Sequence, residues 1–383
     1  MSRLSELIRD LCPDGVEYRP LGEVAVLERG TPITKKQIGT GDIPVIAGGR
    51  KPAYSHNVAN REGETLVVAG SGAYAGYVSY WDRPVFVSDA FSIKVDSKIL
   101  LPRFVYHWML GGQSKVHSFK SGGGVPHVYA KDVARLLCPM PPLEVQREIV
   151  RVLDKFTMLE AELEAELEAR RKQYEYYREQ LMREAAICET RALIDISVTT
   201  RSGGTPRSNN ASYYNGVIPW LRTQDIDFCD IWETSASITE EGLYNSSARW
   251  VPIGCVIIAM YGATAAKAAM NRIPLTMNQA CCAFEIDNSK AVARYVYHWI
   301  ASQYVPLRSQ GEGSQNNLSV GKLKKVQVPL PSIYEQRRIA DILDRFDALV
   351  NDISSGLPAE IAARRKQYEH YRDRLLLFPE KRA

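Results

Sequence analysis

Two turn-rich parts of the sequence carry the side chains best suited to bind a polyanion and read its edges. Arg can make two hydrogen bonds to guanine, Asn or Gln can make two to adenine, and Lys can neutralise a phosphate. In the first part the candidates are Lys35, Lys36, Arg50, Lys51, Lys120 and His127, with His117 beside them. In the second part they are Arg201, Arg207, Asn209, Asn210, Arg222, Gln224, Asn316 and Asn317, with Gln315 beside them. Each residue taken singly also suits a solvated loop.

Motifs that carry catalysis are missing from the sequence. It has no G-x-x-x-x-G-K-[ST] phosphate loop, no H-E-x-x-H, and no N-P-P-Y or D-P-P-Y string of amino-methyltransferases. The run Gly70–Gly76 is spaced one residue too long for a dinucleotide fingerprint, and the strand-like Y-V-S-Y-W follows it, so a tight turn is expected. Pro13–Arg19 reads as a turn, and His107 and His298 read as packing residues on amphipathic helices. We therefore expect no catalytic residue, no metal site and no cofactor bound by this chain.

Composition places the chain among ordinary globular proteins. Of its 383 residues 45% are hydrophobic and 24% are charged, and the formal net charge is +4. The small positive excess lies mainly in the globular parts, and it agrees in sign with a polyanionic partner. The seven cysteines include no C-x-x-C pair and read as reduced thiols. A charged N-terminus and the lack of a long apolar run predict a cytoplasmic protein with no membrane contact.

The chain is a tandem duplication. The string A-R-R-K-Q-Y-E occurs at Ala169–Glu175 and again at Ala363–Glu369. Upstream of this string, Pro141–Phe156 corresponds to Pro331–Phe346. The string R-F-V-Y-H-W from Arg103 likewise corresponds to R-Y-V-Y-H-W from Arg294. A period of about 190 residues lets each copy hold its own hydrophobic core, unlike the short units of a solenoid.

Four segments follow from this repeat. Residues 1–140 and 187–330 are expected to be globular α+β domains, and residues 141–186 and 331–383 are expected to be helical spacers. Short apolar runs bounded by Gly, Pro, Asn and Asp predict strands, and helices are expected at Pro102–Leu110 and Val292–Ala301. The predicted strands are Thr65–Ala69, Val85–Val87, Ile93–Val95, Cys255–Met260 and Ala283–Ile286.

The spacers carry a heptad pattern of apolar residues, at separations of three, four and seven. In the first spacer the pattern predicts one helix from Leu143 to about Ala185, roughly 60 Å long. Glu160 and Arg170 occupy positions in this seam, either as partner contacts or as solvated residues after a shift in register. The apolar and aromatic seam residues are Leu153, Phe156, Leu163, Leu167, Tyr174 and Tyr177 in the first spacer, and Leu343, Phe346, Ile361, Tyr368 and Tyr371 in the second.

The second spacer differs by the insertion of S-S-G-L-P-A-E. Gly356 and Pro358 should break the helix, and Ser355 could cap a new helix with Pro358 in its first turn. A single helix with one apolar stripe is not stable alone in water, so the two spacers are expected to pack on each other. Connectivity alone allows either orientation, and an antiparallel pair is favoured. Such a pair relates the two repeats by an approximate two-fold axis.

These residues together resemble a known family. The pattern P-L-x-x-Q-x-x-I-x-x-x-L-D-x-F followed by A-R-R-K-Q-Y-E-Y-Y-R, the start L-C-P-D-G-V-E-Y-R-P-L-G-E-V at Leu11–Val24, and the two G-T-P turns are similar to specificity subunits of type I restriction-modification enzymes. The resemblance spans the whole chain. In that family the base-reading residues vary with the target, so none is transferred from a motif.

The resemblance implies a DNA-binding, non-catalytic subunit. Each domain would read one half of a split, asymmetric site in double-stranded DNA, and the helices would serve as a ruler and as docking surface for two adenine methyltransferase subunits. Restriction and translocation subunits would join that core. S-adenosylmethionine, ATP and Mg²⁺ would be bound by those partners. Half-sites about one helical turn apart, roughly 34 Å, agree with a paired-helix spacer.

Two other functions remain open from the sequence. A recognition module of a related type II system would look similar, because in such systems methylation and cleavage share one polypeptide. A coiled-coil scaffold that displays two small domains to other proteins is the alternative from a different class, and it predicts no salt-dependent DNA binding.

Overall fold

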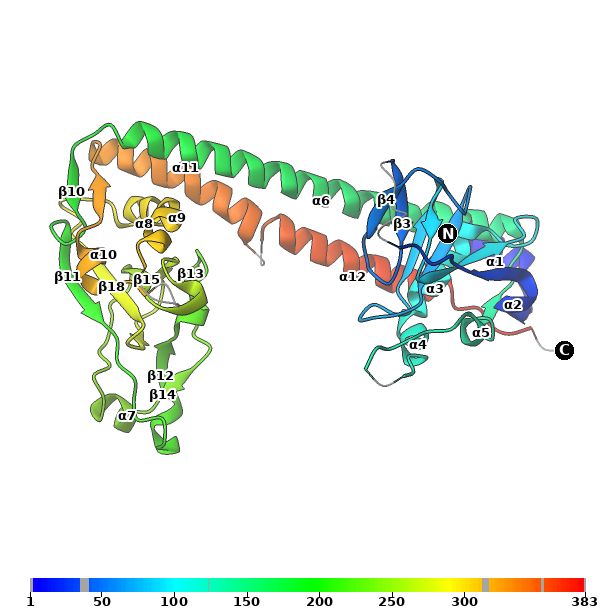
Figure 1. The fold of residues 1–383 in the computed structure, drawn as a ribbon, viewed down its shortest axis with the longest axis horizontal. Coiled ribbons are helices and arrows are strands. Elements are labelled where there is room, and N and C mark those ends of the chain that lie inside the picture. Colours follow the sequence, from blue (N-terminus) through cyan, green and yellow to red (C-terminus); the bar gives the residue numbers. More distant parts are fainter. Residues whose placement is uncertain (1–2, 35–40, 123, 312–316, 353–354, 382–383) are drawn as a thin grey trace. The chain divides into compact units, whose positions relative to one another are not determined.

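The computed structural model describes residues 3–34, 41–122, 124–311, 317–352 and 355–381. They form two compact units (Figure 1). Unit 1 is Met1–Ala165 together with Ala359–Ala383, and unit 2 is Glu166–Pro358. Both units mix helices and strands, as the repeat predicts, and each takes part of its helical spacer from the other copy.

The main sheet of unit 1 has four antiparallel strands in the order β2-β8-β5-β6. They are β2 (Ala25–Arg29), β8 (Ala90–Val95), β5 (Thr65–Ala69) and β6 (Val78–Trp81). A smaller sheet in the order β4-β3-β7 contains β4 (Tyr54–His56), β3 (Ile43–Ile46) and β7 (Phe86–Val87), with β3 and β7 parallel. The helix α3 (Pro102–Gly111) packs on β5 and β6.

Both faces of β5 are covered, which explains why its whole sequence T-L-V-V-A is apolar or buried. Side chains of a strand alternate between faces. Leu66 and Val68 join the larger core with Phe104 of α3, whereas Val67 joins a small core with Val87 of the second sheet. A period-two pattern is therefore not visible in this segment, because neither face meets water.

Unit 2 repeats this plan with more strands. Its main sheet has the order β11-β18-β15-β16-β13, and a second sheet has the order β14-β12-β17. Residues of β15 alternate as in β5: Val256 and Ile258 face the core that contains the helix α8, whereas Ile257 and Ala259 face the other core. The elements are β11 (Ser197–Ser202), β12 (Tyr214–Leu221), β13 (Asp230–Ile231), β14 (Ser237–Ile238), β15 (Val256–Ala259), β16 (Ala268–Asn271), β17 (Thr276–Met277), β18 (Cys281–Ile286) and α8 (Ala293–Ser302).

Short elements complete both units. Unit 1 adds α1 (Arg3–Leu11), β1 (Tyr18–Pro20), α2 (Leu21–Val24), α4 (Gln113–Ser118), α5 (Ala130–Val133) and β9 (Leu137–Pro139), with β1 paired to β9. Unit 2 adds β10 (Thr190–Ala192), the 3-10 turns η2 (Ala211–Tyr213), η3 (Thr223–Asp225) and η4 (Gly262–Thr264), α7 (Glu240–Tyr244), α9 (Tyr304–Ser309), α10 (Val320–Lys324) and β19 (Gln327–Pro329), with β10 paired to β19.

The first spacer is one helix, α6 (Leu143–Ala185), over the range that the heptads predict. In unit 1 it packs on α12 (Leu357–Leu375), where Phe156 stacks on Tyr371 with ring centres 5.3 Å apart. In unit 2 its later part packs on α11 (Ile333–Asn351), where Phe346 stacks on Tyr174 and Tyr177. The pairing is antiparallel in each unit, because contacts that come later on α6 come earlier on its partner. Phe156 meets Tyr371 whereas Glu160 meets Arg365, and Tyr177 meets Phe346 whereas Leu181 and Ala185 share a core with Ile339 and Leu343.

The remaining seam residues are partly buried or paired. Leu163 and Leu167 are half-buried, and Ile361 is buried. Glu160 forms an ion pair with Arg365 of α12, so this seam position holds a contact between the two helices. Arg170 instead binds Glu166 and Gln173 of its own helix.

The second spacer breaks where the glycine predicts. A Cβ atom at Gly356 would lie 2.5 Å from the carbonyl oxygen of Ala348 and 2.8 Å from that of Asp352, so only glycine fits the turn without strain. The expected cap at Ser355 is wrong in detail. The helix α12 begins at Leu357, directly after Gly356, and the Ser355 hydroxyl donates back to the Asp352 carboxylate.

We predict that Gly356→Ala lowers the free energy of unfolding by about 1–3 kcal/mol, because the added methyl group meets backbone oxygens. Thermal melting of the purified chain measures this. Gly321→Ala is the matched control, since a Cβ atom there meets only the Ser319 hydroxyl at 3.8 Å. A Gly356→Ala chain that melts with the control would contradict the prediction.

A candidate nucleic-acid interface in each unit

Three loops of unit 1 come together at one end of its main sheet. The backbone N–H of Val128 donates to the Gly70 carbonyl (3.0 Å), and that of Gly72 donates to the Pro126 carbonyl (3.0 Å). A Cβ atom at Gly48 would lie 2.5 Å from the Ser71 carbonyl oxygen, so the loop after β3 also touches this turn. The end of unit 1 formed by residues 47–53, 70–77, 117–122 and 124–129 is here called loop end 1.

Loop end 1 gathers cationic and aromatic side chains. The Arg50 guanidinium carbon lies 5.0 Å from the ring centre of Tyr74, and the Lys120 amine donates to the Ala73 carbonyl (3.3 Å). The His127 and Tyr129 rings are stacked, with centres 6.1 Å apart. Of the predicted contact residues, Arg50, Lys51, Lys120 and His127 lie here, whereas Lys35 and Lys36 fall outside the described residues.

His117 stands at the edge of the same group. Partial burial lowers its pKa, and the positive charges of Lys120 and Arg50 lower it further. Its Nε2 atom is buried and has no hydrogen-bond partner among the described residues. The ring is therefore held neutral near pH 7 within a cationic surface.

The corresponding end of unit 2, here called loop end 2, is formed by residues 203–213, 222–229, 260–267, 278–280 and 317–319. The N–H of Leu318 donates to the Met260 carbonyl (2.8 Å), matching the bond from Val128 to Gly70 in unit 1. The N–H of Asn278 donates to the Leu221 carbonyl (2.9 Å), which joins a further loop to the same end.

At loop end 2 the candidate side chains are held by polar contacts instead of rings. Arg222 and the Gln224 amide both donate to the Ser235 hydroxyl, at 3.1 and 3.3 Å. The Asn210 carboxamide accepts from the Ser212 N–H and caps η2. Arg207, Asn209 and Asn317 also lie on these loops, and Asn316 falls outside the described residues.

Arg201 occupies a different setting from the other candidates. It lies within strand β11, and its guanidinium donates to the Glu285 carboxylate of β18 at 2.8 Å. The structure thus gives this side chain an intramolecular partner, where the sequence had suggested a loop contact.

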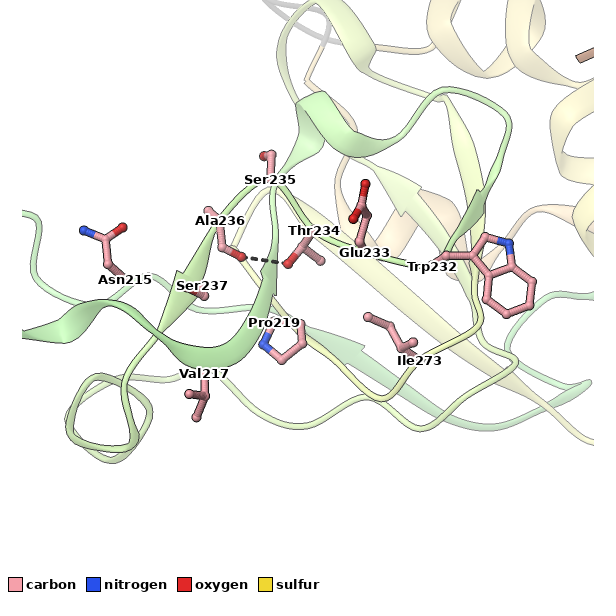
Figure 2. Close-up of a pocket in the computed structure, with 10 residues that line it drawn as sticks. All are labelled: Asn215, Val217, Pro219, Trp232, Glu233, Thr234, Ser235, Ala236, Ser237 and Ile273. Carbon is pink, nitrogen blue, oxygen red and sulfur yellow. Dashed lines mark hydrogen bonds between the residues drawn. The ribbon is translucent and has the colours of Figure 1, made fainter. Parts of the chain in front are cut away.

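A hollow of about 350 Å³ adjoins the Arg222 group in unit 2 (Figure 2). Ser235, which holds Arg222 and Gln224, is part of its lining, with Trp232 and Ile273 toward one end and Asn215 toward the other. The Trp232 side chain is 68% exposed. The lining offers one carboxylate, Glu233, and no histidine, cysteine, lysine or arginine, so it supplies binding contacts and no pair for acid–base chemistry.

The remaining histidines, cysteines and acidic residues are of the types that metal binding and nucleophilic catalysis use. Within the described ranges, no three His, Cys, Asp or Glu side chains meet as a group that could hold a metal ion. Burial raises the pKa of the Cys255 and Cys282 thiols to about 12, so neither is a thiolate near pH 7. No described helix is long and apolar enough to cross a membrane.

An Arg–Asp–His network, in which the histidine is buried and the other two side chains are partly exposed, joins each globular part to its spacer helix. In unit 1, Arg103 and His107 of α3 both bond to Asp154 of α6 at 2.8 Å, and the other ring nitrogen of His107 bonds to the Tyr368 hydroxyl of α12 at 2.8 Å. Burial alone would raise the pKa of Asp154, but the bond to His107 and the charge of Arg103 lower it. The carboxylate is thus ionised and shared by two helices.

Unit 2 contains the same network at the repeated positions. Arg294 and His298 of α8 bond to Asp344 of α11 at 2.5 and 2.6 Å. Arg294 also binds Asp230 at the start of β13 (2.6 Å). The second ring nitrogen of His298 is buried and has no partner among the described residues, unlike that of His107.

Sequence reasoning had treated His107 and His298 as packing residues and had not singled out the arginines or aspartates. The signal was present, because R-x-x-x-H and L-D-x-F recur in both copies while the loops around them do not. The structure shows that these residues, which are identical in the two copies, bind one another.

We predict that Asp154→Ala lowers the free energy of unfolding of unit 1 by about 2–4 kcal/mol, because Arg103 and a buried histidine lose their shared partner. Limited proteolysis with thermal melting would locate and measure the loss. Asp10→Ala, at an exposed ion pair, is the control and should stay within about 0.5 kcal/mol of the parent. Equal losses in both variants would contradict the prediction.

A pH dependence follows from His107. Burial lowers its pKa below the usual 6.5, so the unfolded chain binds a proton near pH 6 that the folded chain does not. The stabilisation that comes from burying neutral His107 is therefore complete above about pH 6.5 and decreases as the pH drops below that value. Asp154 adds no slope there, since its lowered pKa places its change below pH 3.8.

His107→Gln should accordingly melt at a lower temperature than the parent at pH 7.5 but lose less between pH 7.5 and 5.5. His370→Gln, which removes an exposed histidine, should keep the parent's slope. Identical slopes for parent and His107→Gln would refute this assignment.

Comparison with known proteins gives one consistent answer. The family model described as "Type I restriction modification DNA specificity domain" matches residues 13–169 and again 188–363. The chain is 33% identical to the type I restriction enzyme EcoR124I/EcoR124II specificity subunit of Escherichia coli, over 99% of this chain and 98% of that protein. It is 29% identical to a putative type I specificity subunit of Haemophilus influenzae, over 95% and 96% of the two chains.

Solved structures share the fold. The S subunit of a type I restriction-modification system from M. genitalium superposes with a TM-score of 0.65 at 16% identity, covering 94% of this chain and 96% of that one. A chain from a study of complex assembly and conformational transition of the type I system superposes with a TM-score of 0.55 at 17% identity, covering 95% and 98%.

Proposed function

The chain belongs to the family of type I restriction-modification DNA specificity subunits, and from that premise we propose that loop end 1 and loop end 2 each read one half of a split, asymmetric site in double-stranded DNA. One observation carries the proposal. The two units share one framework, yet the same end of it presents Arg50, Lys51 and Lys120 in unit 1 and Arg222 with Gln224 in unit 2. A duplicated framework with different contact residues suits a target whose halves differ.

Two kinds of side chain at the loop ends are proposed to make different contacts with DNA. Lysines such as Lys51 and Lys120 are suited to phosphates, which set affinity and register, whereas Arg and Gln side chains held in fixed directions are suited to base edges. The small positive excess of the chain fits a complex in which partner subunits supply part of the phosphate contact.

Catalysis is proposed to lie in partner subunits. Two adenine methyltransferase subunits would bind S-adenosylmethionine, and restriction subunits would bind ATP and Mg²⁺. Large apolar side chains on the outer surface of the spacer helices support docking there: Met158 of α6 is 61% exposed in unit 1, and Tyr176 of α6 and Tyr334 of α11 are 64% and 78% exposed in unit 2. In this proposal the spacer helices also set the distance between the half-sites.

The test is to express the chain with the adenine methyltransferase subunit of its own system and to map N6-methyladenine by single-molecule sequencing. We expect a split motif methylated on opposite strands. Replacing residues 1–140 by those of the E. coli relative should change one half of the motif, and replacing residues 187–330 should change the other half.

A stable complex that methylates no split motif would refute this function and favour the scaffold alternative. A swap of residues 1–140 that alters both halves would show that the units do not read DNA independently.

A further inference from the structure

Arg50 is held in place by two aromatic rings at loop end 1. Its guanidinium carbon lies 5.0 Å from the centre of the Tyr74 ring and 5.8 Å from that of the Tyr77 ring. Both distances fall within the range of cation–π attraction. Attraction to two rings restricts where the guanidinium can lie, so its position is constrained before any ligand arrives.

The backbone supports this placement. Arg50 follows Gly48, whose close approach to the Ser71 carbonyl holds the loop after β3 against the turn between β5 and β6. The same turn carries Tyr74 and Tyr77, and it is bonded in turn to Val128 through Gly70. Arg50 and its two rings therefore belong to one braced part of unit 1.

The hydrogen-bond donors of Arg50 are unused. Within the described part of the chain, its guanidinium has neither a hydrogen bond nor an ion pair, and the side chain is exposed. Two other arginines of unit 1 differ: Arg61 bonds to Ser92 and to a backbone carbonyl, and Arg103 lies over Tyr80 but is bound to Asp154. A fixed and unsatisfied fork is suited to an external partner that offers two acceptors side by side.

Two chemical groups of DNA offer such acceptors, a phosphate and the O6 and N7 atoms of guanine. Lys51 and Lys120 already supply flexible positive charges that suit phosphate. A guanidinium held between rings can direct two hydrogen bonds at a particular base edge, and a contact to phosphate does not require such a direction. We propose that Arg50 reads a guanine in the half-site bound by unit 1, and that Tyr74 and Tyr77 are positioning residues for it. This inference rests on the proposed function.

The corresponding loop of unit 2 supports the role of this position. Both loops begin at the end of a strand that pairs in parallel with its neighbour, after Ile46 in unit 1 and after Leu221 in unit 2. The loop of unit 2 carries Arg222 and Gln224, both anchored on Ser235. Both copies thus hold the proposed base-reading side chains in the loop after this strand. In unit 1 aromatic rings hold Arg50, and in unit 2 the Ser235 hydroxyl holds Arg222 and Gln224.

The test compares variants of the full chain in the complex with its methyltransferase. The motif of the parent and of Arg50→Ala, Arg50→Lys and Tyr74→Ala is mapped in cells. Binding of each purified complex is then measured on duplexes that differ only at each G·C pair of the half-site assigned to residues 1–140. The matched control is Arg83→Ala, because Arg83 also stacks on a ring, that of Trp81 at 5.8 Å, but follows β6 at the opposite end of the strand from loop end 1.

We expect Arg50→Ala to lose a preference of roughly 5- to 150-fold for one G·C pair, so that any base is accepted there, with the other half of the motif unchanged. Arg50→Lys should keep overall affinity but lose most of this preference, since it keeps the charge without the fork. Tyr74→Ala should lose about 2- to 5-fold of the same preference. Arg83→Ala should match the parent.

Three outcomes would overturn the inference while leaving the proposed function intact. The parent half-site could contain no G·C pair, Arg50→Ala could leave the motif and binding unchanged, or it could weaken binding to every duplex equally, as loss of a phosphate contact would. If the parent complex methylates no split motif, the proposed function fails and the inference fails with it.

Discussion

In each unit a carboxylate on the spacer helix binds an arginine and a histidine of the helix that packs on the main sheet, next to a glutamine and an apolar core that join the same two parts. Asp154 and Asp344 are shared between an arginine and a buried histidine from the neighbouring helix. A partly buried carboxylate that accepts two hydrogen bonds from one helix is satisfied in few geometries, so the contact helps to specify the position of that helix. Because α3 and α8 pack on the main sheets, fixing either helix on its spacer fixes the strands, and the strands carry the loops.

The two copies keep this contact but surround it differently. His107 is bonded on both ring nitrogens, the second to Tyr368, whereas His298 leaves one nitrogen without a partner among the described residues. Arg294 in turn gains Asp230 of β13, so the second network extends into the sheet. The framework has thus been maintained by two slightly different sets of bonds since the duplication.

Some elements of regular structure could be predicted from the sequence because their signals are local, whereas strands such as β2 and β12 were not predicted. The helix Leu143–Ala185, the break at Gly356 and the buried strand Thr65–Ala69 each follow from spacing or from one residue's backbone preference. The contact between Arg103, His107 and Asp154 could not be predicted from spacing, because it joins residues about fifty positions apart across two elements. Repetition of both motifs was the only sign of it.

Loop residues were harder still, for a physical reason. A surface arginine such as Arg201 looks the same in sequence as Arg50, yet one is bound to Glu285 in a sheet and the other is stacked and unpaired at a loop end. What separates them is the chain's path, which Gly48 and the turn after β5 determine. Residue type therefore limits what a loop can bind, and the backbone decides which side chains are free to bind it.

Separating a rigid framework from variable loops has a consequence for how specificity can change. A substitution at Arg50 changes an exposed side chain that has no hydrogen bond among the described residues, while the Asp154 contact, the sheets and the helix pairing stay satisfied. Its effect on folding is small, since exposed side chains contribute little to stability. The same substitution in a protein with one undivided recognition surface would affect contacts to the whole site. If each unit reads one half-site, as proposed, then one half-site can change while the other is kept, and the substitutions needed are confined to a few side chains at one loop end.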